Sequence, residues 1–460
     1  MWGTARAKDV RDLVFAEVEQ YRESGYNVAA IDEELSRSGG FERISMAACE
    51  EAYRKLDHIT RDESWTANEP ESLEEIRASA RWPEASSPDL RAAPDYEARL
   101  RDAWTGRVCG NMLGKPVEAG DDWTSDRLVR FLKEVGNWPV QGYFPDVDPT
   151  TMGYPEFREC RSTTVAGKVD GSSRDDDVDY TVLNLHLLLD RGRDFQTSDV
   201  AAAWLTLLPV MQTYTAERAT ICRLIEGYGV PEARLTRNPY REWIGAAIRA
   251  DVFGYVNPGD CGSAAELAYK DAVVSHAANG VYGEMWCAAL VAAAFDSSSA
   301  REAIERALAV IPPRSRLYRE IVAVMADYDA GMGWSATVKE IQARTGHYSW
   351  VHTINNAGIL TAGLLYGAGS FTETIGLTVA GGWDTDSNGA TAGSVGALLG
   401  YSIPETFSKP LHGTVHSAVF GWDGVSIDQL AALTARVDEP SCVESILGKP
   451  LLRFVTPEEW

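Results

Sequence analysis

The apolar residues of this chain recur mostly at helical spacing. Val10, Leu13, Val14 and Val18 follow the pattern i, i+3, i+4, i+8, which places them on one face of a helix. From residue 96 onward, stretches rich in Ala and Leu repeat this spacing, and most are bounded by Gly, Pro, Asp or Ser. These stretches are 200–212, 262–275, 283–296, 300–311, 317–328, 357–366 and 389–399. Alternating strand patterns are nearly absent, so we predict a compact, multi-helix all-α protein.

The chain divides near residue 95. Residues 8–60 carry helical spacing, whereas residues 61–95 are rich in charge and Pro and contain few aliphatic residues. This composition is typical of a linker, here with room for one short helix. We therefore predict an N-terminal helical extension and linker over residues 1–95 and a catalytic domain over residues 96–460. The sequence does not show what the extension does, or the oligomeric state.

The composition excludes several classes of function. The 460 residues carry a net charge of -24, which argues against a nucleic-acid or anionic-membrane surface. Solubility explains such a charge, and a cation site is also compatible with it. No apolar run reaches the length of a membrane span, and the N-terminal MWGTARAKDVRDLVF contains no apolar signal-peptide core. The seven cysteines include no CxxC pair, which indicates buried thiols in a reducing compartment and no soft-metal site. We expect a cytoplasmic protein.

One predicted helix carries glycines at a regular spacing that suits close packing of a second backbone. Gly106, Gly110 and Gly114 recur every four residues, so they share one face of a helix. Each glycine costs about 1 kcal/mol in helix propensity, and such a stripe lets a second backbone approach closely. Pro116 ends this helix, and Glu118 follows just beyond it.

Three consecutive acids, Asp175, Asp176 and Asp177, precede an apolar helix face. One carboxylate at a helix start is explained by capping and by the helix dipole. Three in a row repel one another unless a positive charge lies between them. A calcium loop of the EF-hand kind is excluded, because Tyr180 stands where its glycine is needed and His186 where its glutamate is needed.

A second acidic cluster opens another helix. Asp384, Asp386 and Ser387 precede a run of Gly, Ala, Ser and Thr, whose small side chains suit a helix buried in the middle of the domain. Buried carboxylates require pairing or a metal, and Arg174 and Lys168, the nearest basic residues in the sequence, are too few to neutralise five aspartates. Oxygen-only ligands indicate hard cations. We predict that both clusters meet around two Mg²⁺ ions, with Mn²⁺ as the alternative.

These motifs, taken in order, resemble the ADP-ribosylglycohydrolase family of the dinitrogenase-reductase-activating glycohydrolase type. GNMLGKPVE at 110–118 is similar to the family's G-x-x-x-G-x-P-x-E pattern, and GGWDTDSNGATAG at 381–393 to its G-G-D-T-D-[TS] pattern. Asp175 to Val178 stands in the place of the T-D-D-T metal motif, and His276 in SHAANGVYGEMW in the place of a family histidine. The resemblance spans roughly residues 96–410. It implies an all-α fold with a central binuclear metal site, and cleavage of the N- or O-glycosidic bond at the anomeric carbon of ADP-ribose.

The resemblance also implies roles for individual residues. Glu118, Asp176 and Asp384 are the candidate catalytic carboxylates. Beside the metals, Glu118 is expected to act as general base or to orient the substrate, and nearby carboxylates to stabilise oxocarbenium-like charge. The candidate substrate-binding residues are Glu118, His276, His352, Trp383 and Ser172, although a structural role explains His276, His352 and Trp383 as readily. The predicted metal ligands are Asp175, Asp176, Asp177, Asp384, Asp386 and Ser387.

The chain departs from the family pattern at the metal motif. Asp175 replaces the first threonine of T-D-D-T, Val178 replaces the last, and Trp383 is inserted before Asp384. This variant resembles a bacterial branch of the family. The leading prediction is a Mg²⁺-dependent hydrolase of ADP-ribosylated substrates. A hydrolase of a small N-riboside or nucleoside is the first alternative, and a non-catalytic ADP-ribose-binding or interaction protein the second.

Overall fold

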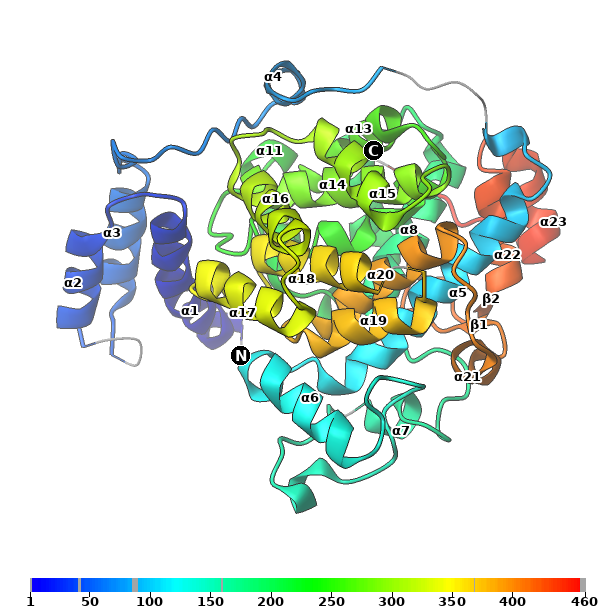
Figure 1. The fold of residues 1–460 in the computed structure, drawn as a ribbon. Coiled ribbons are helices and arrows are strands. Elements are labelled where there is room, and N and C mark those ends of the chain that lie inside the picture. Colours follow the sequence, from blue (N-terminus) through cyan, green and yellow to red (C-terminus); the bar gives the residue numbers. More distant parts are fainter. Residues whose placement is uncertain (1, 40–42, 85–89, 159, 368, 456–460) are drawn as a thin grey trace.

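A computed structural model describes residues 2–39, 43–84, 90–158, 160–367 and 369–455, without the side chains of residues 2–10 and 12 (Figure 1). The prediction of an all-α fold is confirmed. The β-structure within the described residues, apart from isolated bridges, is one antiparallel pair of two-residue strands, β1 (Thr414–Val415) and β2 (Val425–Ser426). In the same part of the chain, no helix combines the length and the apolar composition needed to cross a membrane.

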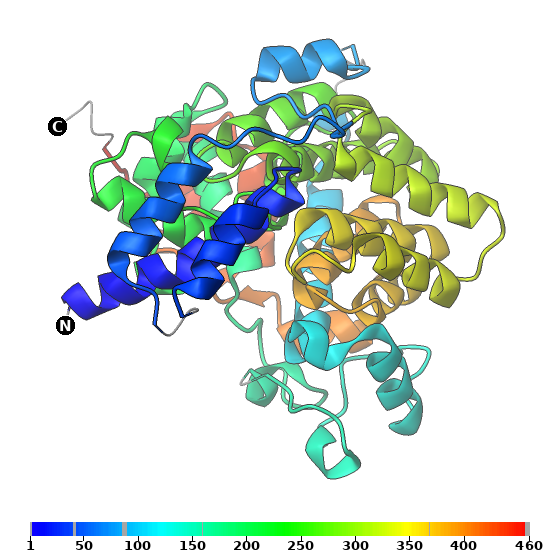
Figure 2. The same ribbon diagram turned by 90° about the vertical axis from the view of Figure 1, so that its left-hand side faces the viewer.

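The first three helices form a unit with its own hydrophobic core. They are α1 (Trp2–Glu23), α2 (Ala29–Arg37) and α3 (Met46–Leu56), and they lie at one side of the main body (Figures 1 and 2). Val14, Val18, Ile31 and Leu56 are among the residues of this core, which shows why the spacing of apolar residues follows the helical period. The side chain of Val10 lies outside the described residues.

The predicted linker contains one α-helix among its described residues, α4 (Leu73–Ser79), followed by a short 3₁₀ turn at Leu90–Ala92. Ser72 caps α4 by accepting a hydrogen bond from the Glu75 amide. Residues 85–89 of this linker lie outside the described residues. The expectation of one short helix within an irregular segment is therefore met.

Polar contacts attach the N-terminal helices to the main body. Gln20 and Ser24 both donate hydrogen bonds to Glu242, at 2.9 and 2.8 Å. The buried Glu242 carboxylate also pairs with Arg316, at 2.6 Å, and Arg316 in turn pairs with Glu69 at 2.9 Å. A buried charge pair of this kind is stable only when its remaining polar atoms are also hydrogen-bonded. Gln20 and Ser24 provide these bonds for Glu242, and Glu69 provides them for Arg316.

The main body is helical throughout, and every predicted Ala- and Leu-rich stretch lies wholly or largely within helix. Its α-helices are α5 (Tyr96–Gly114), α6 (Ser125–Glu134), α7 (Arg161–Thr164), α8 (Asp176–Arg191), α9 (Thr197–Leu207), α10 (Thr215–Ile225), α11 (Val230–Ala233), α12 (Asp251–Tyr255), α13 (Cys261–Ala272), α14 (Ala278–Ala294), α15 (Ala300–Ala307), α16 (Arg316–Asp329), α17 (Trp334–Thr345), α18 (Thr353–Tyr366), α19 (Phe371–Ala380), α20 (Thr385–Leu398), α21 (Glu405–Ser408), α22 (Ile427–Ala435) and α23 (Val443–Leu447).

The central helix pair of the body is α5 and α20. Every residue of α20 is buried, as its small side chains predict. Cβ atoms placed on Gly106, Gly110 and Gly114 would overlap the backbone carbonyls of Gly393, Gly389 and Thr385, respectively. The glycine stripe therefore does allow a second backbone to approach, and the partner is α20. This contact brings the end of α5 beside the first turn of α20.

Candidate metal centre and active site

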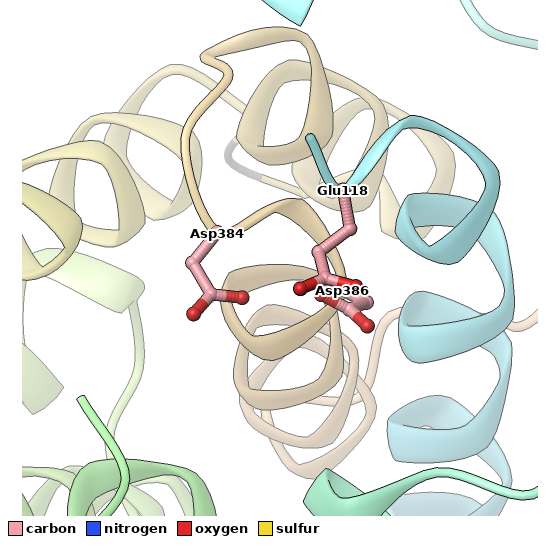
Figure 3. A group of neighbouring side chains, drawn as sticks. All are labelled: Glu118, Asp384 and Asp386. Carbon is pink, nitrogen blue, oxygen red and sulfur yellow. The ribbon is translucent and has the colours of Figure 1, made fainter. Parts of the chain in front are cut away.

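Carboxylates from three separate parts of the chain converge at the ends of α5, α8 and α20. Glu118, Asp384 and Asp386 each offer an oxygen within 4.8 Å of the others, and Figure 3 shows their side chains directed into a common space. A second group, Asp175, Asp177 and Asp386, meets the same limit. Asp386 belongs to both groups, so the two acidic helix starts do meet, as predicted.

The start of α8 is held by buried hydrogen bonds from α5. Asp175 is the N-cap, and its Oδ1 accepts from the Asp177 amide and from Asn111 Nδ2, both at 3.1 Å. Arg107 donates to the backbone carbonyl of Asp177 at 2.7 Å and pairs with Asp251 at 2.8 Å. Because Asn111 and Arg107 both lie on α5, that helix fixes the first turn of α8 relative to α20.

A tight turn precedes α20. Gly382 and Trp383 both have positive φ, 84° and 62°, and for tryptophan this conformation is strained. Asn356 of α18 then stabilises the helix start, because its Oδ1 accepts from the Asp384 amide at 3.2 Å and from Asn388 at 2.7 Å. Thr385 donates to the Gly114 carbonyl at 2.8 Å. The strained turn and these bonds direct Asp384 and Asp386 toward Glu118.

Burial and mutual repulsion raise the pKa values of the site carboxyls. Burial is the largest cause for each group, and neighbouring carboxylates add to it. The pKa of Asp176 rises to about 8 and that of Asp386 to about 6, while those of Glu118 and Asp384 lie well above their usual range. Such a site binds either protons or a cation at neutral pH.

Of the two cations that the sequence pointed to, Arg174 acts on the site through Asp176. Lys115 and Arg158 also lie beside the carboxylates. Lys115 pairs with Asp175, and Arg158 lies 3.4 Å from Glu118. Arg174 instead pairs with Asp179 at 2.6 Å, and Lys168 pairs with Asp146 at 2.8 Å. No sequence pattern indicates the contact of Lys115 with Asp175, because 60 residues separate the partners. Only the adjacency of Lys115 to the Pro116–Glu118 motif places it near the site.

The residues present fit a divalent cation with oxygen ligands. Among the described residues, Oδ1 of the buried Asp177 has no hydrogen-bond partner, and an unpartnered buried carboxylate oxygen is unfavourable. Asp177 belongs to one of the two groups of converging oxygens, and Ser387 is buried beside them at the start of α20. Carboxylate and hydroxyl oxygens without sulfur suit Mg²⁺ or Mn²⁺.

The two predicted histidines lie in buried networks. His276 is fully buried, its Nδ1 lies 2.8 Å from Ser275 Oγ, and Glu217 and Arg249 are its charged neighbours. His352 is the N-cap of α18, where Nδ1 accepts from the Ile354 amide at 3.2 Å. Burial lowers the pKa of His352 to about 3. Neither ring belongs to the converging carboxylate groups.

The two remaining predicted substrate residues lie on segments that lead into the site. Ser172 is buried, with its amide donating to the Thr414 carbonyl at 3.1 Å and its Oγ accepting from the His416 amide at 2.8 Å. These bonds tie the segment before α8 to β1. Trp383 is half-buried directly before Asp384 and packs partly against the main core.

Comparison with known proteins identifies the family. The family model for ADP-ribosylglycohydrolase matches residues 92–441. The chain belongs to the ADP-ribosylglycohydrolase family. All the converging carboxylates lie within the matched residues, and membership supports a glycohydrolase role for the chain.

The solved structures include a similar chain. An "ADP-ribosylglycohydrolase-related protein complex" is similar at 17% sequence identity over 75% of this chain and 99% of that chain, with a TM-score of 0.43. No curated protein sequence matches this family member.

Proposed function

We propose that the protein hydrolyses a ribosyl bond at the anomeric carbon in a Mg²⁺-dependent reaction, with ADP-ribosylated molecules as the leading substrate class. The observation that carries this proposal is the convergence of Glu118, Asp384 and Asp386 within 4.8 Å at the ends of α5 and α20. Family membership supports the hydrolase class. The motifs at 110–118 and 381–393 support the dinitrogenase-reductase-activating type, and the variant metal motif at 175–178 supports its bacterial branch.

The proposed metal ligands are the six residues of the two helix starts: Asp175, Asp176, Asp177, Asp384, Asp386 and Ser387. When bound, Mg²⁺ or Mn²⁺ supplies positive charge that polarises substrate oxygens and lowers the pKa of water. The orphan Oδ1 of Asp177 and the raised pKa values of Asp176 and Asp386 support a cation requirement.

Glu118 is suited to moving a proton. Its side chain is 22% exposed, the only one of the Glu118–Asp384–Asp386 group that is not buried, so a substrate or water can reach it. Burial and the neighbouring Asp386 raise its pKa and so favour its protonated form, whereas Arg158, at 3.4 Å, stabilises its charged form. Asp176 is likewise half-buried, and with Asp384 it provides negative charge near the expected position of the anomeric carbon.

One observation favours a small N-riboside as the second candidate substrate. Lys115, Arg158 and Arg174 lie beside the carboxylates, yet each already contacts an acid, namely Asp175, Glu118 and Asp179. A diphosphate would compete for these cations, whereas an uncharged riboside would not.

A hydrolysis screen with added Mg²⁺ tests the proposal. ADP-ribosyl-arginine, ADP-ribosyl-serine, free ADP-ribose derivatives and simple nucleosides serve as substrates, and release of ribose or ADP-ribose is the readout. Turnover of an ADP-ribosyl substrate that stops with EDTA supports the leading proposal, and turnover of nucleosides alone supports the second. If the screen gives no metal-dependent release of either product, the proposed reaction is wrong.

A further inference from the structure

Lys115 contacts a carboxylate of the second group of converging oxygens. Its ammonium contacts Asp175 Oδ2, and Asp175 belongs to the group with Asp177 and Asp386. The other oxygen of Asp175 already accepts two hydrogen bonds, from Asn111 and the Asp177 amide. An ion at Asp175 Oδ2 would therefore lie directly beside the Lys115 ammonium, and this repulsion opposes binding unless Lys115 is displaced.

The surroundings of Lys115 oppose its displacement. Its side chain is only 12% exposed and that of Asp175 only 5%, and separating a buried ion pair leaves two charges without partners. Its backbone is also held, because the Lys115 carbonyl accepts from the Glu118 amide at 3.5 Å and from Cys160 Sγ at 3.6 Å. The preceding residue, Gly114, packs against the backbone of α20.

The charge balance of the site is consistent with the Lys115 ammonium as one of its cations. Asp175 stands where the family pattern has an uncharged threonine, so this chain carries one additional negative charge. Lys115 supplies one positive charge next to it, and its field also acts on Asp176, Asp177 and Asp386. The unpartnered Asp177 Oδ1 is one acceptor of the site that the described residues leave free for an ion.

We propose that Lys115 replaces one of the two divalent ions: its ammonium holds the Asp175–Asp177–Asp386 group together, and a single ion binds at Glu118, Asp384 and Asp386. This inference rests on the proposed metal-dependent function and changes its stoichiometry. It makes Lys115 a positioning residue. Lys115 holds Asp175 in place and, through its field on Asp386, also positions a ligand of the remaining ion.

Ion counting tests this inference without any substrate. The full chain is dialysed against Mn²⁺, bound metal is measured by atomic absorption, and electron paramagnetic resonance reports whether two Mn²⁺ ions are coupled. Asp386→Asn removes a ligand common to both groups. The Mn²⁺ bound by this variant therefore measures the background binding by acidic residues on the surface. Above that background we expect one uncoupled ion per chain in the wild type and in Lys115→Arg, and two coupled ions in Lys115→Met.

Each other result overturns the proposal in a recognisable way. Two coupled ions in the wild type show that Lys115 moves aside, which overturns the proposal and leaves the metal-dependent function intact. One ion in folded Lys115→Met shows that Lys115 does not exclude the second ion. No specific ion in the wild type removes the metal site itself, and the proposed function fails with it. The wild-type count relies only on the Asp386→Asn background, so the test stands even if Lys115→Met does not fold.

Discussion

Gly110 of α5 and Gly389 of α20 pack backbone against backbone, with no room for a side chain on either. This contact sets the distance between the helix that leads to Glu118 and the helix that begins with Asp386. The spacing of the carboxylate centre thus depends on a contact between main-chain atoms.

Gly389→Ala should destabilise the protein by about 2–3 kcal/mol, because a methyl group there would overlap the Gly110 carbonyl and force the helices apart. Urea unfolding measures this change. Gly396→Ala is the matched control on the same helix, where a Cβ atom meets its neighbours at 3.4–3.8 Å. We expect this control to be neutral or to stabilise by up to about 1 kcal/mol through helix propensity. Equal losses in both variants would contradict the backbone-contact argument.

Asp386→Asn should reduce turnover at least about 10²-fold and remove the rise in melting temperature caused by Mg²⁺, because Asp386 belongs to both carboxylate groups. Steady-state kinetics and thermal melting, with and without Mg²⁺, measure the two effects. Asp122→Asn, at an exposed position of the segment that follows Glu118, is the control and should change neither. Retention of the Mg²⁺ shift in Asp386→Asn would exclude this carboxylate as a ligand.

Without metal, the free energy of unfolding should fall as the pH rises from about 4 to about 8. The folded pKa values of Asp386 and Asp176, about 6 and about 8, exceed the unfolded value of 3.8, so the folded state keeps protons that the unfolded state releases. The loss should reach at least about 1 kcal/mol. Melting curves in EDTA measure it, and saturating Mg²⁺ should restore most of the stability above pH 7 and little at pH 5. A flat EDTA profile would show that these carboxyls are not perturbed.

Glu23, at the C-terminal end of α1, should weaken the attachment of the N-terminal helices as the pH rises. Burial and the nearby Glu242 raise its pKa to about 7, so the stability it contributes is present below about pH 4.5 and is lost as the pH passes 7. Glu23→Gln should therefore stabilise the protein at pH 8.5 by on the order of 1 kcal/mol and have little effect at pH 5. Glu33→Gln, on the exposed face of α2, is the control. An equal effect of Glu23→Gln at both pH values would show that the carboxyl is solvated.

Trp383→Ala should raise KM by about 2- to 10-fold with kcat nearly unchanged, if the indole stacks on the base or sugar as predicted. Its position directly before Asp384, half-buried and with φ of 62°, motivates this expectation. Initial-rate kinetics separate the two constants, and thermal melting reports any change in packing. A lower melting temperature with unchanged KM would assign Trp383 to the core instead.

Sequence periodicity predicted the fold, and the acidic motifs together with the family resemblance predicted most of the carboxylate cluster. Helix spacing identified the buried helices, and the run of small residues after Asp384 indicated a helix that could enter the centre. The contacts of Lys115 with Asp175 and of Asn356 with the Asp384 amide were missed, because they join residues distant in sequence and depend on side-chain direction. His276 shows the same limit, since only the structure reveals Arg249 and Glu217 around it.

The Glu242–Arg316 pair constrains when the N-terminal helices can dock during synthesis on the ribosome. Gln20 and Ser24 are made early, but Glu242 emerges about 220 residues later and Arg316 later still. The first three helices can assemble their small core at once, yet they have nothing to dock onto until most of the chain has been synthesised. The earliest part of this protein to be made therefore docks only after residues 242 and 316 have been synthesised.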